Sequence, residues 1–270
     1  MIKSLARGAA LCALLLAAGP ASAADLEEIK ARGHMEAATS GNLPPVSFVN
    51  EKNELTGFDI QVAKGVEKRL GVEIRLNRLD FKGILPGLQT GRFDAVFSNV
   101  NITPERKDTF DYSIPYSRSA VVVVRRAGAD DITGPDTLAG KQVGAISGAN
   151  DGEVPARALE KEHGAFGAFR GYAGYSEMFA DLGIGRVEAI VAPDTAAANF
   201  IRQRPGVAEI VGEPVQVRFV GVPMQKGSAA LKAEIDKAIR EMRDGGEIDA
   251  WAKEFFGIEN FSAQLVDEVP

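Results

Sequence analysis

A run of short polar side chains follows a segment with the composition of a buried strand. Ser98, Asn99 and Asn101 come directly after the apolar run 93–97. Open α/β sheets bind ligands at the carboxyl ends of their strands. We therefore predict that these three side chains belong to a site for a small molecule.

A helix is predicted to begin just after this polar run. Thr103 is a typical N-cap residue, and Pro104 is favoured at the first helical position. A helix start presents free backbone N–H groups, and the planar guanidinium of Arg106 can donate two hydrogen bonds to one carboxylate. Together these features predict an anion site. The alternative is that Arg106 is a solvated arginine on a surface helix.

A second polar turn has the same setting of strand, turn and helix. Residues 147–150 follow a predicted strand at 141–146 and precede a helix expected to begin near Asp151. Asn150 and Asp151 can donate to and accept from a ligand, or they can cap that helix. Phe81 also lies between a predicted strand and a predicted helix, where it either stacks on a ligand or belongs to the core.

Patterns typical of enzymes do not occur here. His34 and His163 are the only histidines and lie far apart in the sequence, so no histidine-rich metal site is expected. Ser147 lacks the flanking glycines of a nucleophile elbow. The segment 134–142 is spaced incorrectly for a phosphate-binding loop, and Lys141 is followed by glutamine rather than serine or threonine. We expect no metal, no cofactor and no catalytic residue.

The elements that must position these residues alternate between helix and strand, which predicts an α/β fold. In residues 58–70 the apolar side chains fall on one helical face, and Gly71 ends that run. Strands are predicted at 72–76, 93–97, 141–146 and 189–192, and further helices at 82–89, at 175–184 and near the C-terminus.

One pattern occurs twice, in residues 81–96 and 175–190, at a constant offset of 94 residues. Each copy begins with an aromatic residue and has a leucine seven positions later. Gly-Arg, an apolar residue, an acid, alanine and a β-branched residue then follow. The same unit of helix, turn and strand built twice predicts two similar lobes, each with its own sheet. The alternative is chance similarity in a chain rich in glycine and alanine.

Two segments with strong β propensity, 119–126 and 215–222, flank the second copy. If both cross between the lobes, they form a hinge that bends easily about one axis. We then predict a discontinuous first lobe of residues 24–118 and 217–270 and a second lobe of residues 119–216. The alternative is that both segments are core strands of a single sheet.

The N-terminus has the three parts of a secretory signal peptide. Lys3 and Arg7 precede a short apolar run, and Ala21-Ser22-Ala23 supplies the small residues of a cleavage site. The run is about ten residues long, whereas a membrane-spanning helix needs about 20, which argues against a retained anchor. We predict that residues 1–23 are removed, and with them the only cysteine, Cys12.

The mature chain is acidic. Without Lys3 and Arg7, 29 of the 31 basic residues remain against 37 acidic ones, a net charge of −8. This balance argues against nucleic acid or an anionic membrane as the main partner. The 247 residues that remain of 270 suffice for one large domain or two of ordinary size.

In several stretches the sequence resembles the family 3 periplasmic solute-binding proteins, which serve amino-acid importers of the ATP-binding-cassette (ABC) type. The resemblance runs from about Asp25 to Gly257, and its most specific stretches are 55–72, 84–107, FDYSIPYSRS at 110–119 and DTLAGKQVGAISG at 136–148. It implies a two-lobed fold with two hinge strands and one ligand in the cleft. It also implies a monomeric periplasmic protein that captures a small amino acid, or a related carboxylate, and hands it to a membrane permease.

The resemblance also implies particular ligand contacts. In such proteins the arginine at the position of Arg106 pairs with the α-carboxylate of the ligand. The other contacts fall on the residues that match the family motifs: Ser98, Asn99 and Asn101 on the first lobe, Phe81 packing on the ligand, and Ala149 and Asn150 closing over the carboxylate.

Two places depart from the family pattern. Many relatives carry an acid near Ser40 for a basic ligand side chain and an aromatic residue at Leu43, so their replacement argues against lysine or arginine as ligand. Relatives also hold the α-amino group with an aspartate after a strand of the second lobe. Pro193 takes that position here and Asp194 follows it. Either a local shift lets Asp194 serve, or the ligand lacks an ordinary α-amino group.

The main alternative to a binding protein is an enzyme on the same fold. Some relatives are periplasmic cyclohexadienyl (prephenate or arogenate) dehydratases, in which a carboxylate in the cleft is the general acid. Asp194, Asp151 or Glu153 would take that role here. The sensor lobe of a receptor is a third class, which we do not expect because no second apolar segment of membrane length is present.

Overall fold

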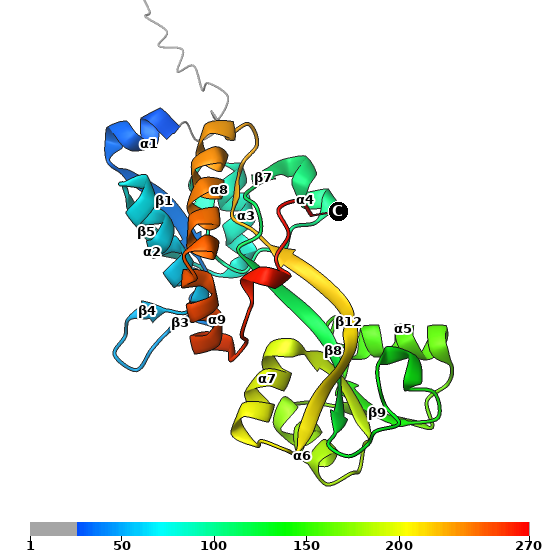
Figure 1. Cartoon of the computed structure of the whole chain (residues 1–270). Helices are drawn as coiled ribbons and strands as arrows, with labels where there is room; N and C mark the ends of the chain where they lie inside the picture. The colour runs from blue at the N-terminus through cyan, green and yellow to red at the C-terminus, as the bar shows by residue number, and fades with distance from the viewer. Residues whose placement is uncertain (1–25, 270) are drawn as a thin grey trace, which may run out of the picture.

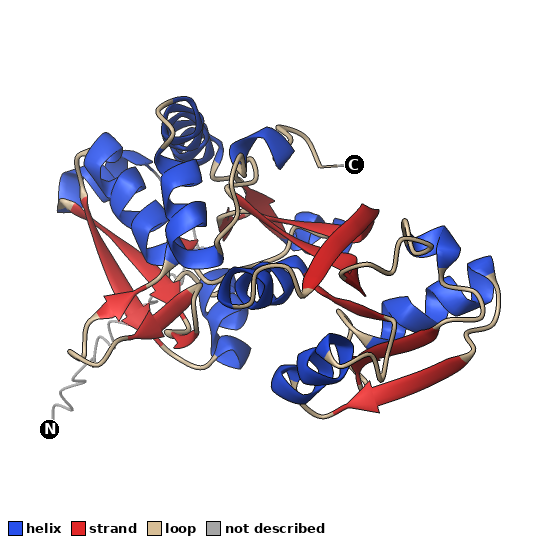
Figure 2. Cartoon of the chain, turned by 60° about the horizontal axis from the view of Figure 1, so that its bottom comes forward, coloured by secondary structure: helices blue, strands red, loops and turns tan. Residues whose placement is uncertain are grey.

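The computed structural model describes residues 26–269, so the predicted signal peptide lies outside the described residues. Within them, two five-stranded sheets lie in separate lobes, and each sheet is covered by helices (Figures 1 and 2). This confirms the two-lobed α/β fold predicted from the sequence. None of the helices in residues 26–269 combines the length and apolar character that a membrane span requires.

The sheet of the first lobe draws its strands from distant parts of the chain. Its order is β5 (Glu73–Arg78), β1 (His34–Thr39), β6 (Ala95–Val96), β13 (Pro223–Gln225) and β7 (Phe110–Tyr112). β1 is parallel to β5 and β6, whereas β13 is antiparallel to β6 and β7. The helices of this lobe are α1 (Leu26–Arg32), α2 (Phe58–Leu70), α3 (Phe81–Gln89), α4 (Pro104–Thr109), α8 (Ala229–Asp244) and α9 (Glu247–Phe256), with a short 3₁₀ helix η2 (Ser262–Gln264).

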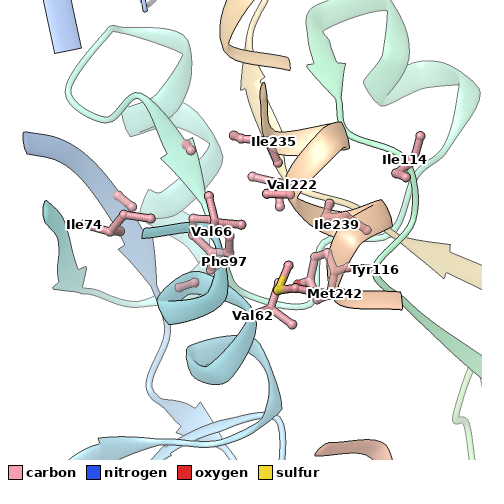
Figure 3. Close-up of a cluster of buried hydrophobic side chains, with 14 of the residues drawn as sticks. Val62, Val66, Ile74, Phe97, Ile114, Tyr116, Val222, Ile235, Ile239 and Met242 are labelled. Carbon is pink, nitrogen blue, oxygen red and sulfur yellow. The ribbon is translucent and has the colours of Figure 1, made fainter. Parts of the chain in front are cut away.

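Helix α2 shows how the apolar periodicity builds this lobe. Val62 and Val66 lie on its buried face, and Gly71, with φ 69°, ends the helix in the left-handed conformation. That face packs against Ile239 and Met242 of α8 in the first lobe's core (Figure 3). Burying one such side chain stabilises the fold by about 1.5–3 kcal/mol.

A small antiparallel sheet joins the first lobe beside α2. It consists of β2 (Asn42–Leu43), β3 (Ser47–Val49) and β4 (Leu55–Thr56). The link between its first two strands, residues 44–46, lines the same cavity as residues of the second lobe. Gly57, with φ 120°, connects this sheet to α2, and a Cβ at that position would lie 2.4 Å from the carbonyl oxygen of Val46. Only glycine fits this close approach.

The second lobe has a sheet of the same size. Its order is β10 (Ala168–Tyr172), β9 (Gln142–Ile146), β11 (Ala189–Pro193), β8 (Ser117–Arg126) and β12 (Ala208–Val220). The first three strands are parallel, and β8 is antiparallel to both β11 and β12. Its helices are η1 (Pro135–Thr137), α5 (Glu153–His163), α6 (Tyr175–Gly183) and α7 (Asp194–Gln203).

The two segments predicted to cross between the lobes are β8 and β12. They pair with each other from Ser117 opposite Val220 to Arg126 opposite Ala208, and they run from one lobe into the other (Figure 1). Each is therefore a strand of the second sheet and also a connection to the first lobe. The predicted lobe boundaries at 118/119 and 216/217 fall within these strands and stay predictions.

The internal repeat corresponds to two equivalent units. Its copies form α3 with β6 in the first sheet and α6 with β11 in the second, and Phe81 and Tyr175 are the first residues of their helices. The strand expected at 93–97 is shorter than predicted, although its flanks Asp94 and Phe97 still donate backbone hydrogen bonds to β1. Helix α5 begins at residue 153, two residues later than expected.

Candidate ligand-binding site

A cavity of about 660 Å³ lies where the two lobes and the crossing strands meet. Small-molecule sites commonly have volumes of about 300–1,000 Å³. Three predicted site residues, Leu43, Asn99 and Asn101, line it from the first lobe. Arg118 and Ser119 contribute from β8, and Asp151, Tyr175 and Thr195 contribute from the second lobe.

Two hydrogen bonds fix the polar segment that follows β6. The buried Ser98 hydroxyl accepts a hydrogen bond from the backbone N–H of Ser40 (3.0 Å). Asn99 has φ 51°, which is uncommon outside glycine, and its N–H donates to Asp59 Oδ2 (2.6 Å). Ser98 and Ser40 therefore position this segment without lining the cavity, whereas Asn99 lines it.

Asp59 lies in the first turn of α2 and is fully buried. Its carboxylate accepts the hydrogen bond from Asn99 and a second one from the Tyr116 hydroxyl (3.0 Å). Burial raises the pKa of Asp59 to about 7, and the two hydrogen bonds oppose this shift. Asp59 was not predicted from the sequence, because no local pattern shows that the start of α2 contacts residues 98–101, which follow about 40 residues later.

The predicted helix start after this segment is confirmed. The Thr103 hydroxyl accepts a hydrogen bond from the Arg106 backbone N–H (3.4 Å), and Pro104 is the first helical residue. The Arg106 guanidinium donates to the backbone carbonyl of Asn101 (3.0 Å). Arg106 forms no ion pair within residues 26–269, is half-buried and does not line the cavity. Its contact with a ligand carboxylate stays a prediction.

Asn101 carries an unused hydrogen-bonding group at the cavity. Its side-chain Oδ1 is buried and has no hydrogen-bond partner, although Asn101 lines the cavity. Buried polar groups without a partner are costly, by about 1–3 kcal/mol. A ligand donor, or a ligand acceptor after the amide turns over, would satisfy this group.

The polar turn after β9 presents one residue to the cavity. Asp151 lines it, whereas the predicted residues Ala149 and Asn150 do not. The backbone carbonyl of Asn150 accepts a hydrogen bond from the Arg218 guanidinium (3.2 Å), which ties the turn to β12. The contact of Ala149 and Asn150 with a ligand stays a prediction.

Asp194 forms a buried ion pair instead of facing the cavity. Its Oδ2 lies 2.8 Å from Nη1 of Arg118, and both side chains are less than a tenth exposed (5% and 7%). The backbone N–H groups of Thr195 (2.8 Å) and Ala120 (3.4 Å) donate to its other oxygen. Burial raises the pKa of Asp194, while the charge of Arg118 opposes that shift. No local shift brings Asp194 to the cavity wall, where Pro193 and Thr195 lie instead.

Three large side chains with apolar surface on the two lobes are exposed: Phe81 (41%), Leu43 (44%) and Tyr175 (39%). Leu43 and Tyr175 line the cavity and Phe81 does not, so the packing of Phe81 on a ligand stays a prediction. Tyr175 was not predicted as a site residue. It takes the place of Phe81 in the second copy of the internal repeat, and that pattern was the signal that could have found it.

The charges on the cavity wall favour an anion. Three arginines line it, Arg118, Arg202 and Arg218, and Asp151 is the one acidic residue of the lining among the described residues. Arg118 is already paired with Asp194. Guanidinium groups bind carboxylates strongly, so the site suits a ligand with at least one carboxylate. No group of three or more metal-binding side chains occurs in residues 26–269.

Comparison with known proteins decides the class of this chain. The model of the bacterial extracellular solute-binding proteins, family 3, matches residues 35–258. The chain belongs to this family. This family 3 protein is 31% identical over 235 residues to the L-cystine-binding protein TcyJ of Escherichia coli (strain K12). The aligned region covers 87% of this chain and 86% of TcyJ.

Solved structures of two similar proteins differ in their ligand state. The L-cystine solute receptor of Neisseria gonorrhoeae, unliganded and open, aligns with a TM-score of 0.77 at 25% identity over 88% of this chain and 98% of the receptor. An ancestral arginine-binding protein bound to arginine aligns with a TM-score of only 0.55 at 35% identity, over 84% of this chain and 99% of that one. A different angle between lobes lowers a whole-chain score without changing either lobe. This family 3 protein therefore superposes better on the unliganded, open receptor than on the arginine-bound protein.

Family membership confirms the prediction of a solute-binding protein that is not an enzyme. TcyJ, the gonococcal receptor and the ancestral protein are all named for binding and none for a reaction. The dehydratase alternative is not favoured. The residues that contact the ligand remain to be tested.

Proposed function

We propose that this protein captures a small amino acid in the cavity between its lobes and delivers it to the membrane permease of an ABC importer. The observation that carries the proposal is a cavity lined by both lobes, with Asn99 and Asn101 on one wall and Asp151 and Tyr175 on the other. A ligand that contacts both walls binds best when the lobes close. Such a ligand shifts the equilibrium toward the closed form by its preference for that form.

The α-carboxylate of the ligand is assigned to the anion site of the first lobe. Arg106 forms no ion pair within residues 26–269, and it lies beside Asn101, whose side-chain oxygen has no partner. A small rotation of the Arg106 side chain would free its guanidinium from the Asn101 carbonyl for the ligand. Phe81, still exposed in the open form, would then pack on the ligand after closure.

L-Cystine is the first ligand to test. TcyJ and the gonococcal receptor are both named for L-cystine. Ser40 is uncharged and buried where relatives that bind basic ligands carry an acid, which argues against lysine and arginine. Arginines on the cavity wall argue in the same direction, because they repel a cationic side chain.

We further propose the cellular setting that follows from this role. Residues 1–23 direct export and are removed, leaving a monomer in the periplasm. The lobes comprise residues 24–118 with 217–270, and residues 119–216. The crossing strands β8 and β12 would be the hinge, because they are the connection that both lobes share.

Calorimetry on the mature chain, residues 24–270, tests the proposal with L-cystine and the standard L-amino acids as probes. Losing one partner of a buried charged pair costs 2 kcal/mol or more, so Arg106→Ala should weaken binding at least about 30-fold. Lys107→Ala is the matched control, because Lys107 is exposed and bonds to the carbonyl of Val269, away from the cavity. Equal affinity of Arg106→Ala and wild type would overturn the assignment of Arg106.

A further inference from the structure

An amino-acid ligand brings an ammonium group as well as a carboxylate. Removing that cation from water is costly unless the protein supplies a carboxylate or an aromatic face. Among its described residues, the first lobe contributes the amide side chains of Asn99 and Asn101 to the cavity, and no carboxylate. The partner of the ammonium group is therefore expected on the second lobe or on the crossing strands.

Asp194 is poorly placed to be this partner. One oxygen binds the Arg118 guanidinium at 2.8 Å, and the other accepts backbone hydrogen bonds from Thr195 and Ala120. Arg118 is itself buried, so releasing Asp194 would leave an uncompensated charge inside the protein. A ligand would have to break this pair before using Asp194.

Asp151 has the opposite properties. It lines the cavity, and its carboxylate takes part in no hydrogen bond or ion pair within residues 26–269. The nearby Arg218 is directed to the carbonyl of Asn150 rather than to the Asp151 carboxylate. Asp151 is also the one acid of the cavity lining among the described residues, so the cavity holds a single free anionic group.

Tyr175 and Asp151 line the same cavity from the second lobe. Burial raises the pKa of the Tyr175 hydroxyl, and the negative charge of Asp151 adds to that shift. Tyr175 lines the same cavity with 39% of its surface exposed. An aromatic ring next to a carboxylate makes a favourable environment for an ammonium group, because both attract a cation.

The equivalent positions of Tyr175 and Phe81 support a role for both rings. Each is the first residue of the helix that opens its copy of the repeat, and each follows an edge strand of its sheet, β10 or β5. The two lobes therefore present one exposed ring each at corresponding places. Closure of the lobes would bring the second ring to a ligand already held by the first lobe.

We propose that Asp151, which lines the cavity together with Tyr175, receives the ammonium group of the ligand on the second lobe, the role that the sequence left open for Asp194. This assignment rests on the proposed capture of an amino acid. It restricts the ligand class to zwitterionic amino acids. The same carboxylic acids without the ammonium group should bind more weakly.

The test compares an amino acid with its analogue that lacks the ammonium group. L-Cystine and 3,3′-dithiodipropionic acid form such a pair. If another L-amino acid gives the largest thermal shift in a screen of the mature chain, that amino acid and its deaminated analogue are used. Affinities are measured by calorimetry for wild type, Asp151→Asn and Tyr175→Leu. Asp130→Asn is the matched control, since it removes one exposed acid of the same lobe that does not line the cavity.

The expected result is that wild type and Asp130→Asn prefer the amino acid at least tenfold, because hydrogen bonds to charged groups contribute that much to affinity. Asp151→Asn should lose this preference while binding the deaminated analogue as wild type does. Tyr175→Leu should reduce it severalfold. A full preference in Asp151→Asn would overturn the assignment and leave amino-acid capture standing. If no amino acid binds wild type, the proposed function fails, and this assignment fails with it.

Discussion

Replacing Asp59 with asparagine tests how the first lobe holds the segment that faces the cavity. Asp59 is fully buried in α2 and accepts hydrogen bonds from the Asn99 N–H and the Tyr116 hydroxyl. Asparagine has nearly the same shape, and its amide oxygen and nitrogen can serve the same two partners. The substitution therefore removes a buried ionisable group while keeping the contacts that hold Asn99.

The sign of the pH effect follows from the direction of the pKa shift. Burial raises the pKa of Asp59 from 3.8 to about 7 in the folded protein. Between these values the folded state keeps a proton that the unfolded chain releases, so stability falls as the pH rises. This contribution to stability is fully present at pH values below 3.8, the pKa of Asp59 in the unfolded chain, and it is lost once the pH passes about 7. The gap between the two pKa values corresponds to about 4 kcal/mol in the free energy of unfolding.

Urea unfolding of wild type and Asp59→Asn at several pH values between 4 and 8 measures this effect. Other titrating groups are common to both proteins and cancel in the difference of their free energies of unfolding. We expect Asp59→Asn to gain up to about 4 kcal/mol relative to wild type from pH 4 to pH 8. A difference that stays constant over this range would mean that Asp59 has the same pKa in the folded and unfolded states, and that burial does not raise it.

Two further substitutions test the structure around the cavity. Asp194→Ala leaves Arg118 buried without its carboxylate, so the free energy of unfolding should fall by about 3–5 kcal/mol in urea titrations. Adding Arg118→Met should restore part of that loss, and full stability of the single variant would contradict a closed ion pair. Gly57→Ala forces φ 120° and a clash with Val46, so we expect a loss of about 3 kcal/mol. Gly71→Ala, with φ 69° and open space around it, should lose only about 1 kcal/mol, and equal losses would argue against the clash.

Local patterns in the sequence predicted much of the fold. The apolar periodicity of α2 and the glycine that ends it depend only on neighbouring residues, so the helix was predicted with its observed bounds. The repeat of Phe81 and Tyr175 revealed that two equivalent units exist, one in each sheet. Thr103 and Pro104 likewise identified the start of α4, because capping is a local interaction.

Contacts between distant residues could not be predicted in this way. Asp59 and Asn99 are 40 residues apart, and Arg118 and Asp194 are separated by 76. No local pattern of residue types predicts such a pair. The contact of Arg118 with Asp194, for example, depends on how β8 and α7 pack in the folded chain. For the same reason the sequence left two possibilities for Asp194, and the structure added a third, a buried ion pair.

The proposed function requires that the two lobes close around an amino acid. Small-angle X-ray scattering of the mature chain, titrated with L-cystine and with each standard L-amino acid, tests it most directly. We expect that one amino acid lowers the radius of gyration in a saturable way, and that Arg106→Ala shows no such change at the same concentration. Closure of the lobes would be contradicted if the radius of gyration stayed constant with every amino acid, including at concentrations at and above those where calorimetry detects binding.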